Sequence, residues 1–153
     1  MRAVGDHHPT EVRRLEDGAD LAAALALREQ VFCGEQGVGL DVERDGRDGI
    51  ARHLGAFAPG GELIGTCRLL DDGAGTVVVG RVAVHAGHRR RGIGRALIDA
   101  AVAEARRMGA GAVSLHAQLE SEDFYAGQGF TRRGRPFFEA GIEHVTMRRE
   151  PLS

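Results

Sequence analysis

One amphipathic helix stands out in the first third of the chain, between a short strand and a long polar loop. Residues 10–17, TEVRRLED, read as the strand, and residues 17–32, DGADLAAALALREQVF, repeat apolar positions at helical spacing. Asp20 is the predicted N-cap of this helix, because a short carboxylate can accept a hydrogen bond from a free backbone N–H. The apolar positions include Leu21, Leu25, Val31 and Phe32. Residues 34–50 then form a polar, glycine-rich loop, and long loops inside compact domains are often functional.

Strand patterns and turn signals dominate the middle of the chain. Residues 52–58 and 62–70 are predicted to pair as a hairpin across PGG, and residues 76–84, TVVVGRVAV, form a strongly β-branched strand. A helix is predicted over about residues 92–108. Its apolar side carries Ile93, Leu97, Ile98, Ala101, Ala105 and Met108, and its polar side carries Arg95, Asp99 and Arg106. Glu104 breaks this pattern.

Three shorter elements complete the chain. Residues 109–117 read as a strand, residues 122–130 as a short helix ending in glycine, and residues 141–150 as a final strand. Antiparallel hairpins followed by one strand–helix–strand crossover predict an α+β fold with a mixed sheet. We expect residues 1–9 to be a flexible N-terminus and residues 10–153 to be a single domain.

Composition narrows the function classes. The 153 residues, 42% hydrophobic and 27% charged, suit one globular domain. The sequence has no apolar run long enough for a membrane span and no secretory signal in MRAVGDHHPT, so we expect a cytoplasmic protein without a membrane partner. The formal net charge of −2 argues against nucleic acid as a partner. Cys33 and Cys67 form no C-x-x-C motif, and we expect reduced thiols.

A local basic run, HRRRGIGRAL at residues 88–97, departs from this mildly acidic background. It lies between a strand that ends at Val84 and a helix that starts near Gly92, so it offers free backbone N–H groups and the positive end of a helix dipole. Gly92 and Gly94 carry no Cβ and allow close approach of a ligand, while the arginines add positive charge. The run therefore predicts a site for an anion, most simply a diphosphate.

The spacing of the run excludes two common phosphate motifs. A Walker loop requires Lys, which the chain lacks, and a dinucleotide fingerprint requires a third Gly where Leu97 stands. The remaining pattern is R-x-x-G-x-G, made by Arg89, Gly92 and Gly94. Here VAVHAGHRRRGIGRALI resembles the central motif of the GNAT superfamily of acetyl-CoA-dependent acetyltransferases. The chain departs from that motif at Ala86, where Pro is usual, and at His88, where an aromatic residue is usual.

A second block extends the resemblance. FYAGQGF resembles the GNAT signature in which a Tyr lies near the acetyl-CoA sulfur, and Tyr125 holds that position. Gln118 stands seven residues earlier, where the family often has Asn. Blocks from LREQVFCGEQ to FFEAGIEHVTM, over roughly residues 27–147, are similar to the ElaA-like branch. This implies a GNAT-type fold: a mixed, mostly antiparallel sheet with splayed central strands, flanked by helices.

The resemblance implies acetyl transfer from acetyl-CoA to an amine by direct attack, without a covalent enzyme intermediate. The pantetheine arm would run along Val82, Ala83 and Val84, near Gln118 and Tyr125. The diphosphate would bind the loop residues Arg89, Arg90, Arg91, Gly92, Ile93, Gly94 and Arg95. Tyr125 would assist the leaving thiolate. Reference pKa values of about 10 for Tyr and about 8.5 for a thiol make full proton transfer uphill by about 2 kcal/mol, so we expect a hydrogen bond to the developing thiolate, or a Tyr with a lowered pKa, rather than complete protonation.

The base and the acceptor site stay open between alternatives. Glu35, His116 and His144 are candidates for a base acting directly or through water, and each has a structural alternative; for Glu35 this is an ion pair with Arg68 or Arg81. An interior guanidinium must be paired. Arg68 and Arg81 lie on two consecutive predicted strands. Each therefore pairs either with Glu35, Asp41 or Glu43, or with an anionic group of the substrate. The predicted substrate-binding residues are Glu35, Arg68, Arg81 and His144.

Two other function classes compete with the enzyme. A non-catalytic acyl-CoA sensor would keep the phosphate loop but would not need Tyr125 or a base. An acetyltransferase toxin acting on tRNA would need a basic acceptor surface, whereas residues 34–49 are acidic. The histidines match no metal motif, so we expect no metal. The expected partner is a small-molecule amine, and the expected state is a monomer or a homodimer.

Overall fold

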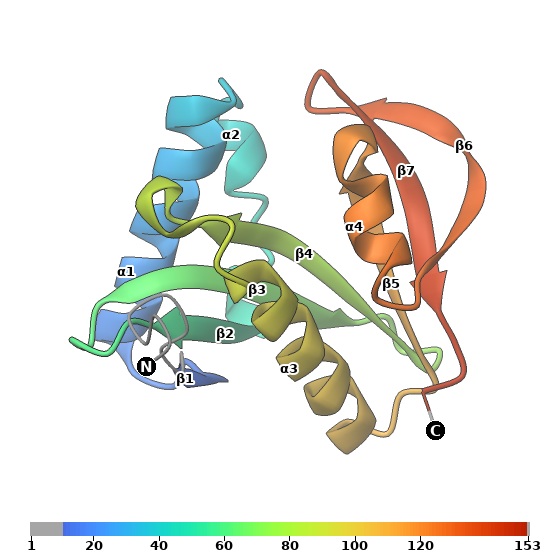
Figure 1. The fold of residues 1–153 in the computed structure, drawn as a ribbon, viewed down its shortest axis with the longest axis horizontal. Helices are drawn as coiled ribbons and strands as arrows, with labels where there is room; N and C mark the ends of the chain where they lie inside the picture. Colours follow the sequence, from blue (N-terminus) through green and yellow to red (C-terminus); the bar gives the residue numbers. More distant parts are fainter. Residues whose placement is uncertain (1–10, 153) are drawn as a thin grey trace, which may run out of the picture.

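A computed structural model of the protein describes residues 11–152, which form one seven-stranded sheet with four α-helices (Figure 1). The strand order is β1-β2-β3-β4-β5-β7-β6. The strands are β1 (Glu11–Arg14), β2 (Arg52–Phe57), β3 (Leu63–Asp71), β4 (Thr76–Val84), β5 (Ala112–Gln118), β6 (Thr131–Glu139) and β7 (Ile142–Arg149). The helices are α1 (Gly18–Arg28), α2 (Leu40–Glu43), α3 (Ile93–Arg107) and α4 (Glu122–Ala126). Among the described strands only β4 and β5 pair in parallel, so the predicted mixed, mostly antiparallel α+β sheet is confirmed.

The two central strands separate midway. Pairing of β4 with β5 runs from Thr76 opposite Ala112 to Val79 opposite Leu115 and then stops. Beyond that point β4 continues against β3, and β5 continues against β7. The β3–β4 register shifts at this level, and Arg81 adopts a φ of 53°, as an extra residue in a β-bulge does. The bulge turns β4 away from β5, which is the splay expected from the GNAT resemblance (Figure 1).

Helix α3 covers one face of the sheet and forms the main core. Its apolar side packs on β2, β3, β4 and β5, with Leu97, Ala101 and Ala105 fully buried. Gly65 on β3 makes room for this packing, because a Cβ there would lie 3.0 Å from the side chains of Ile93 and Leu97. Neighbouring positions on β3 alternate between the faces: Cys67 joins this core, whereas Arg68 contacts the loop that follows α2.

Several sequence expectations needed correction. The N-cap of α1 is Asp17 rather than Asp20: the Asp17 carboxylate accepts a hydrogen bond from the backbone N–H of Asp20 at 2.7 Å. Regular α-helix ends at Arg28, and residues Glu29–Glu35 continue as a wider π-helical turn. Strand β6 was missed, because TRRGRPFFE lacks alternation and contains Pro, which an edge strand tolerates. The predicted flexible residues 1–9 lie outside the described residues.

Within residues 11–152, every helix is too short or too polar to cross a bilayer.

Candidate active site

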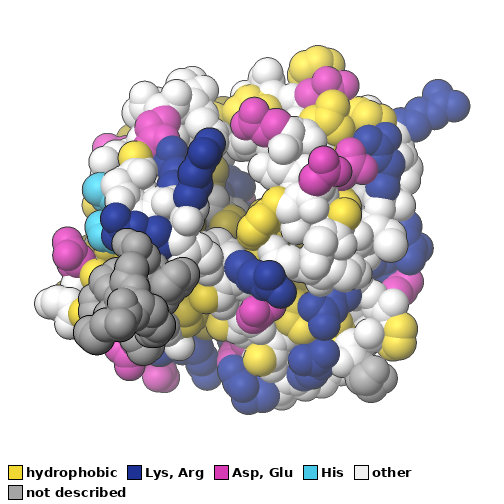
Figure 2. All heavy atoms as spheres, in the orientation of Figure 1, with side chains coloured by type: hydrophobic (Ala, Val, Ile, Leu, Met, Phe, Trp, Pro, Cys, Tyr) yellow, Lys and Arg dark blue, Asp and Glu magenta, His cyan; other side chains and the backbone are white. Residues whose placement is uncertain are grey.

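The separation of β4 from β5 opens a cleft of about 1110 Å³. One side consists of the π-helical turn, α2 and β4, and the other of β5, α4 and the β6–β7 hairpin. Figure 2 shows a hollow between these two halves of the molecule, with arginine side chains beside it. The cleft therefore places the basic loop, the edge of β4 and Tyr125 around one space.

The basic loop lies at one end of the cleft, at the N-terminus of α3. Gly92 caps the helix in the left-handed conformation, with a φ of 81°, and Arg90 is also left-handed at 63°. Apart from its chain neighbours and the helix backbone, a Cβ on Gly92 would meet no atom of residues 11–152 within 4 Å, and one on Gly94 would meet only the ring of Phe124, at 3.4 Å. The glycines thus face open space, which suits close approach of an anion. Six of the seven predicted loop residues line the cleft; Arg91 does not.

The free edge of β4 continues the site from the loop. Val82, Ala83 and Val84 line the cleft. Past Val79, within residues 11–152, no strand pairs with the side of β4 that faces β5. Its backbone groups on that side can therefore bond an extended ligand, as an added strand would.

Glu35 bonds to the basic loop. Its carboxylate lies 2.7 Å from Arg89 Nη2, and Arg89 Nε donates to the carbonyl of Val84 at 3.0 Å. The alternative in which Glu35 is buried against Arg68 or Arg81 is therefore wrong. Glu35 is about one-third exposed, and its partner is Arg89 of the basic loop. Arg89 links the π-helical turn to the end of β4.

Tyr125 lies on α4 at the wall of the cleft. It is 8% exposed and its ring packs edge-on against Phe124 and Phe130. Tyr125 lines the cleft, and its hydroxyl has no hydrogen-bond partner among residues 11–152, so it is available to donate to a ligand there. Burial, with a smaller contribution from the nearby Cys67, raises the pKa of Tyr125 to about 12. A lowered Tyr pKa, one of the two expected ways to assist the thiolate, is thus contradicted, and hydrogen-bond donation remains.

Three further side chains meet at the far wall of the cleft. His116 Nδ1 lies 2.9 Å from Glu139 Oε1. His144 is buried, and its Nδ1 donates to the Ile142 carbonyl at 2.7 Å while its Nε2 lies 3.9 Å from Glu139. Glu139 was not predicted from sequence, because it belongs to the missed strand β6. The structure thus brings both candidate histidines to one carboxylate.

Gln118 bridges the cleft from the same strand as His116. Its side-chain amide donates to Gln36 Oε1 at 2.9 Å, from β5 to the turn after the π-helical segment.

Arg68 and Arg81 are held by carboxylates of the acidic loop. Arg68 bonds Asp45 at 2.6 Å and Asp48 at 3.2 Å, and Arg81 bonds Glu43 at 3.0 Å. Of the partners expected from sequence, only Glu43 takes part; Asp45 and Asp48 were not anticipated as partners. Arg28, which the sequence did not single out, also bonds Glu43 at 2.8 Å and Asp48 at 2.7 Å.

These six groups, three arginines and three carboxylates, form what we call the loop network: Arg28, Arg68, Arg81, Glu43, Asp45 and Asp48. Arg44 extends it by pairing with Glu43 and with Glu29, so the charges stay balanced at four against four. Hydrogen bonds from Arg68 hold the pKa of Asp45 far below its usual range. Burial opposes ionisation of Asp48, but the hydrogen bonds from Arg28 and Arg68 outweigh it and lower the Asp48 pKa. The acidic loop is therefore largely neutralised by arginines of α1, β3 and β4.

Comparison with known proteins agrees with this geometry. The family described as "Acetyltransferase (GNAT) domain" matches residues 42–151. A UPF0039 protein of Mycobacterium tuberculosis is 36% identical over 138 residues, which cover 87% of this chain and 86% of that protein.

Two solved structures share the fold at meaningful sequence identity. Escherichia coli ElaA is 30% identical with a TM-score of 0.82, covering 93% of this chain and all of that one. An acyl-CoA N-acyltransferase from Pseudomonas aeruginosa is 32% identical with a TM-score of 0.82, covering 92% of this chain and 99% of its own. Since the family match spans well over half of the sequence, this chain belongs to the GNAT acetyltransferase family and is an acyltransferase similar to ElaA.

Proposed function

We propose that this protein transfers an acetyl group from acetyl-CoA directly to the amine of a small molecule. The observation that carries the proposal is the meeting, in one cleft, of a glycine loop at a helix N-terminus, an unpaired strand edge and a buried Tyr with a free hydroxyl. An acyl-CoA has the matching parts in the matching order: a diphosphate, an amide-containing arm and a thioester.

The chain's own residues fit this cosubstrate. The backbone amides of Arg89 to Arg95 would hold the diphosphate, and the backbone of Val82 to Val84 would bond the arm. A β4 backbone N–H would stabilise the negative charge on the thioester oxygen during attack. Arg89 would have to release the Val84 carbonyl or share it with the arm, since its guanidinium now bonds that oxygen.

Tyr125 would donate a hydrogen bond to the sulfur as the thiolate leaves. With its pKa near 12, complete proton transfer to a thiolate of reference pKa about 8.5 is uphill by about 5 kcal/mol. The thiolate would therefore take its proton from the substrate ammonium or from water.

His116 is our candidate for the base. Its Nδ1 contacts Glu139, and its Nε2 has no partner in the described part of the chain, so Nε2 can accept the proton of an attacking amine. His144 is less suited, because it is buried with its Nδ1 bound to a backbone carbonyl. Glu35, paired with Arg89, is also less suited as a base.

The acceptor itself is proposed as a small amine with an apolar part. Val31, Phe32, Val38 and Val42 line the acceptor side of the cleft. Arg68 and Arg81 give little support to an anionic acceptor, since the loop network already balances their charge. A thiol-release assay with acetyl-CoA and a panel of primary amines tests the proposal; tight CoA binding without turnover on any amine would favour the sensor.

Replacing Gly94 with Val should weaken CoA binding by about tenfold or more, because the new methyl groups occupy the space next to the amides. The fold should survive, since Val suits a helix at least as well as Gly and only Phe124 lies near. Calorimetric CoA affinity and urea unfolding measure the two effects. Gly111→Val is the matched control at an open position far from the loop; equal affinity in wild type and Gly94→Val would contradict the loop assignment.

Replacing His116 with Gln should lower kcat by about tenfold. The effect is placed below the usual range of about 10²–10⁴ for acid–base groups because His116 is almost half exposed, so water can partly replace it. Steady-state kinetics of His116→Gln, His144→Gln and Glu35→Gln compare the three candidates directly. If only His144→Gln or Glu35→Gln slows turnover, the base is that residue.

A further inference from the structure

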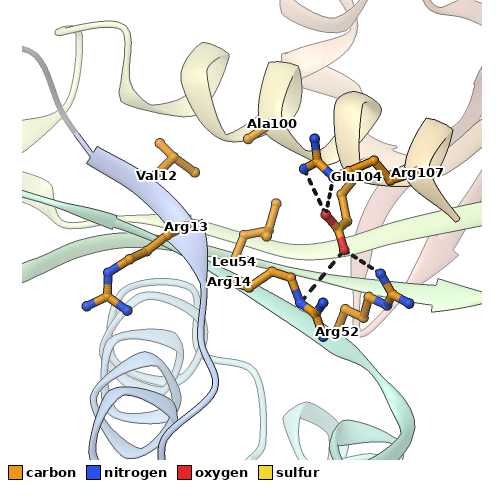
Figure 3. A pocket seen from close by; sticks show the side chains of 8 residues that line it. All are labelled: Val12, Arg13, Arg14, Arg52, Leu54, Ala100, Glu104 and Arg107. Carbon is orange, nitrogen blue, oxygen red and sulfur yellow. Dashed lines mark hydrogen bonds and ion pairs between the residues drawn. The ribbon is translucent and has the colours of Figure 1, made fainter.

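A second pocket, outside the cleft, lies between β1, β2 and the C-terminal half of α3 (Figure 3). Its volume is about 340 Å³, near the lower end of small-molecule sites. Val12, Leu54 and Ala100 form apolar walls, and the charged lining consists of Arg13, Arg14, Arg52, Arg107 and Glu104. Glu104 lies ten residues along α3 from Gly94, or about 15 Å at helical rise, so this pocket is separate from the phosphate loop.

Glu104 is the residue that breaks the apolar pattern of α3, and the pocket explains it. Its side chain is 2% exposed, and three guanidinium groups converge on its carboxylate. Arg52 Nη1 lies 2.5 Å away, Arg107 Nη2 2.8 Å and Arg14 Nε 3.7 Å. Burial opposes ionisation of this carboxylate, but the hydrogen bonds from Arg52 and Arg107 outweigh it and lower the Glu104 pKa.

One carboxylate cannot neutralise three arginines. Arg14, Arg52 and Arg107 against Glu104 leave an excess of two positive charges, whereas the loop network balances three against three. Arg13 does not contribute, because it points away from Glu104 in Figure 3, bonds Asp20 at 3.0 Å and stacks on Phe57.

The three guanidiniums also keep free donors. Within residues 11–152 the Arg14 guanidinium makes an ion pair but no hydrogen bond, Arg52 donates only through Nη1, and Arg107 leaves Nη1 without a partner. Their side chains are 46%, 39% and 67% exposed, so a ligand can reach them from solvent. Several guanidinium forks around one point suit an anion with several oxygens and a charge near −2.

We propose that this pocket binds a dianionic phosphate group, as carried by a small phosphorylated molecule. The arginines would hold the phosphate oxygens, the apolar walls would receive a small hydrocarbon part, and Glu104 would keep the guanidiniums in place in the empty pocket. The proposal does not depend on the acetyltransferase reaction.

Calorimetric titration of the full chain with inorganic phosphate, at constant ionic strength, tests it. Arg107→Gln should weaken phosphate binding by about tenfold, the value of one charge-assisted hydrogen bond, without unfolding the protein, since Arg107 is exposed. Arg106→Gln is the matched control on the same turn, where the guanidinium instead bonds the Leu152 carbonyl. Inorganic phosphate can also bind the phosphate loop as a separate site; Arg90→Gln weakens that second site only and should leave the binding that Arg107→Gln weakens unchanged.

The Glu104→Gln variant should change phosphate affinity in the opposite direction. It removes the competing negative charge and retains all three arginines, so phosphate should bind more tightly than to wild type. A purely structural role for the arginines predicts no gain. Unchanged phosphate affinity in Arg107→Gln, or weaker phosphate binding by a folded Glu104→Gln protein, overturns the proposal. It is also overturned if only Arg90→Gln loses phosphate binding, or if the protein binds succinate more tightly than phosphate. If Glu104→Gln does not fold, the Arg107→Gln comparison decides.

Discussion

Tyr125→Phe should lower kcat by about 10²-fold while acetyl-CoA affinity changes little. Phe keeps the ring that packs against Phe124 and Phe130, so the fold and the cleft wall should be retained. The variant loses one hydrogen bond that forms mainly as charge develops on sulfur, and removing a donor of that kind typically costs about 10²–10³ in rate. Affinity for the cosubstrate should persist because the loop and β4, which would hold it, are untouched.

The pH profile adds a second check on Tyr125. Because burial raises its pKa to about 12, the phenol stays protonated in wild type up to pH 10, and no alkaline limb below that pH belongs to it. Measuring kcat and CoA affinity for both proteins from about pH 6 to pH 10 should therefore give profiles of the same shape, offset by a constant factor. Equal turnover of wild type and Tyr125→Phe would show that Tyr125 is a packing residue.

Glu43→Gln should lower the free energy of unfolding by about 3 kcal/mol, the lower end of the range for breaking a buried ion pair. Glu43 is 1% exposed and its carboxylate lies 2.8 Å from Arg28 and 3.0 Å from Arg81. Gln has nearly the same volume, so the loss is one of charge rather than packing. Arg28 would lose more from the substitution than Arg81, because its charge is also buried, at 1% exposure. Its remaining ion pair with Asp48 limits the loss.

Urea unfolding followed by circular dichroism measures this effect, with Asp41→Asn as the matched control. Asp41 lies in the same short helix α2, is exposed and takes no part in the loop network. Its substitution should change the unfolding free energy by less than about 0.5 kcal/mol. A Glu43→Gln protein as stable as Asp41→Asn would show that the network contributes no net stability.

The loop network has a consequence for the site as well. Arg81 is the left-handed residue of the β4 bulge, and Glu43 bonds its guanidinium both through the carboxylate and through its backbone carbonyl at 3.0 Å. The acidic loop thus holds the residue at which β4 turns away from β5. This accounts for a cluster of charge beside an otherwise apolar part of the cleft.

Local features were predictable from the order of residues. The basic glycine loop between a β-branched strand and a helix follows from neighbours in sequence, because a helix N-terminus and glycine conformation are properties of a few consecutive residues. The strand–helix–strand crossover was predictable for the same reason. The resemblance to GNAT proteins rests on these same short blocks, and the family match confirms it.

Features that depend on distant residues were not predictable. Glu139 meets His116 across 23 positions, Glu104 meets Arg52 across 52, and Arg81 meets Glu43 across 38. Glu104 stood out in the sequence only as a break in the apolar pattern of its helix. For Arg68 and Arg81 the sequence showed that partners were needed, because a buried charge must be paired, but several carboxylates were equally eligible. The choice among them, the raised Tyr125 pKa and the level at which β4 separates from β5 depend on strand register and burial. Those are set only when separate segments pack together, so the tertiary structure alone decided them.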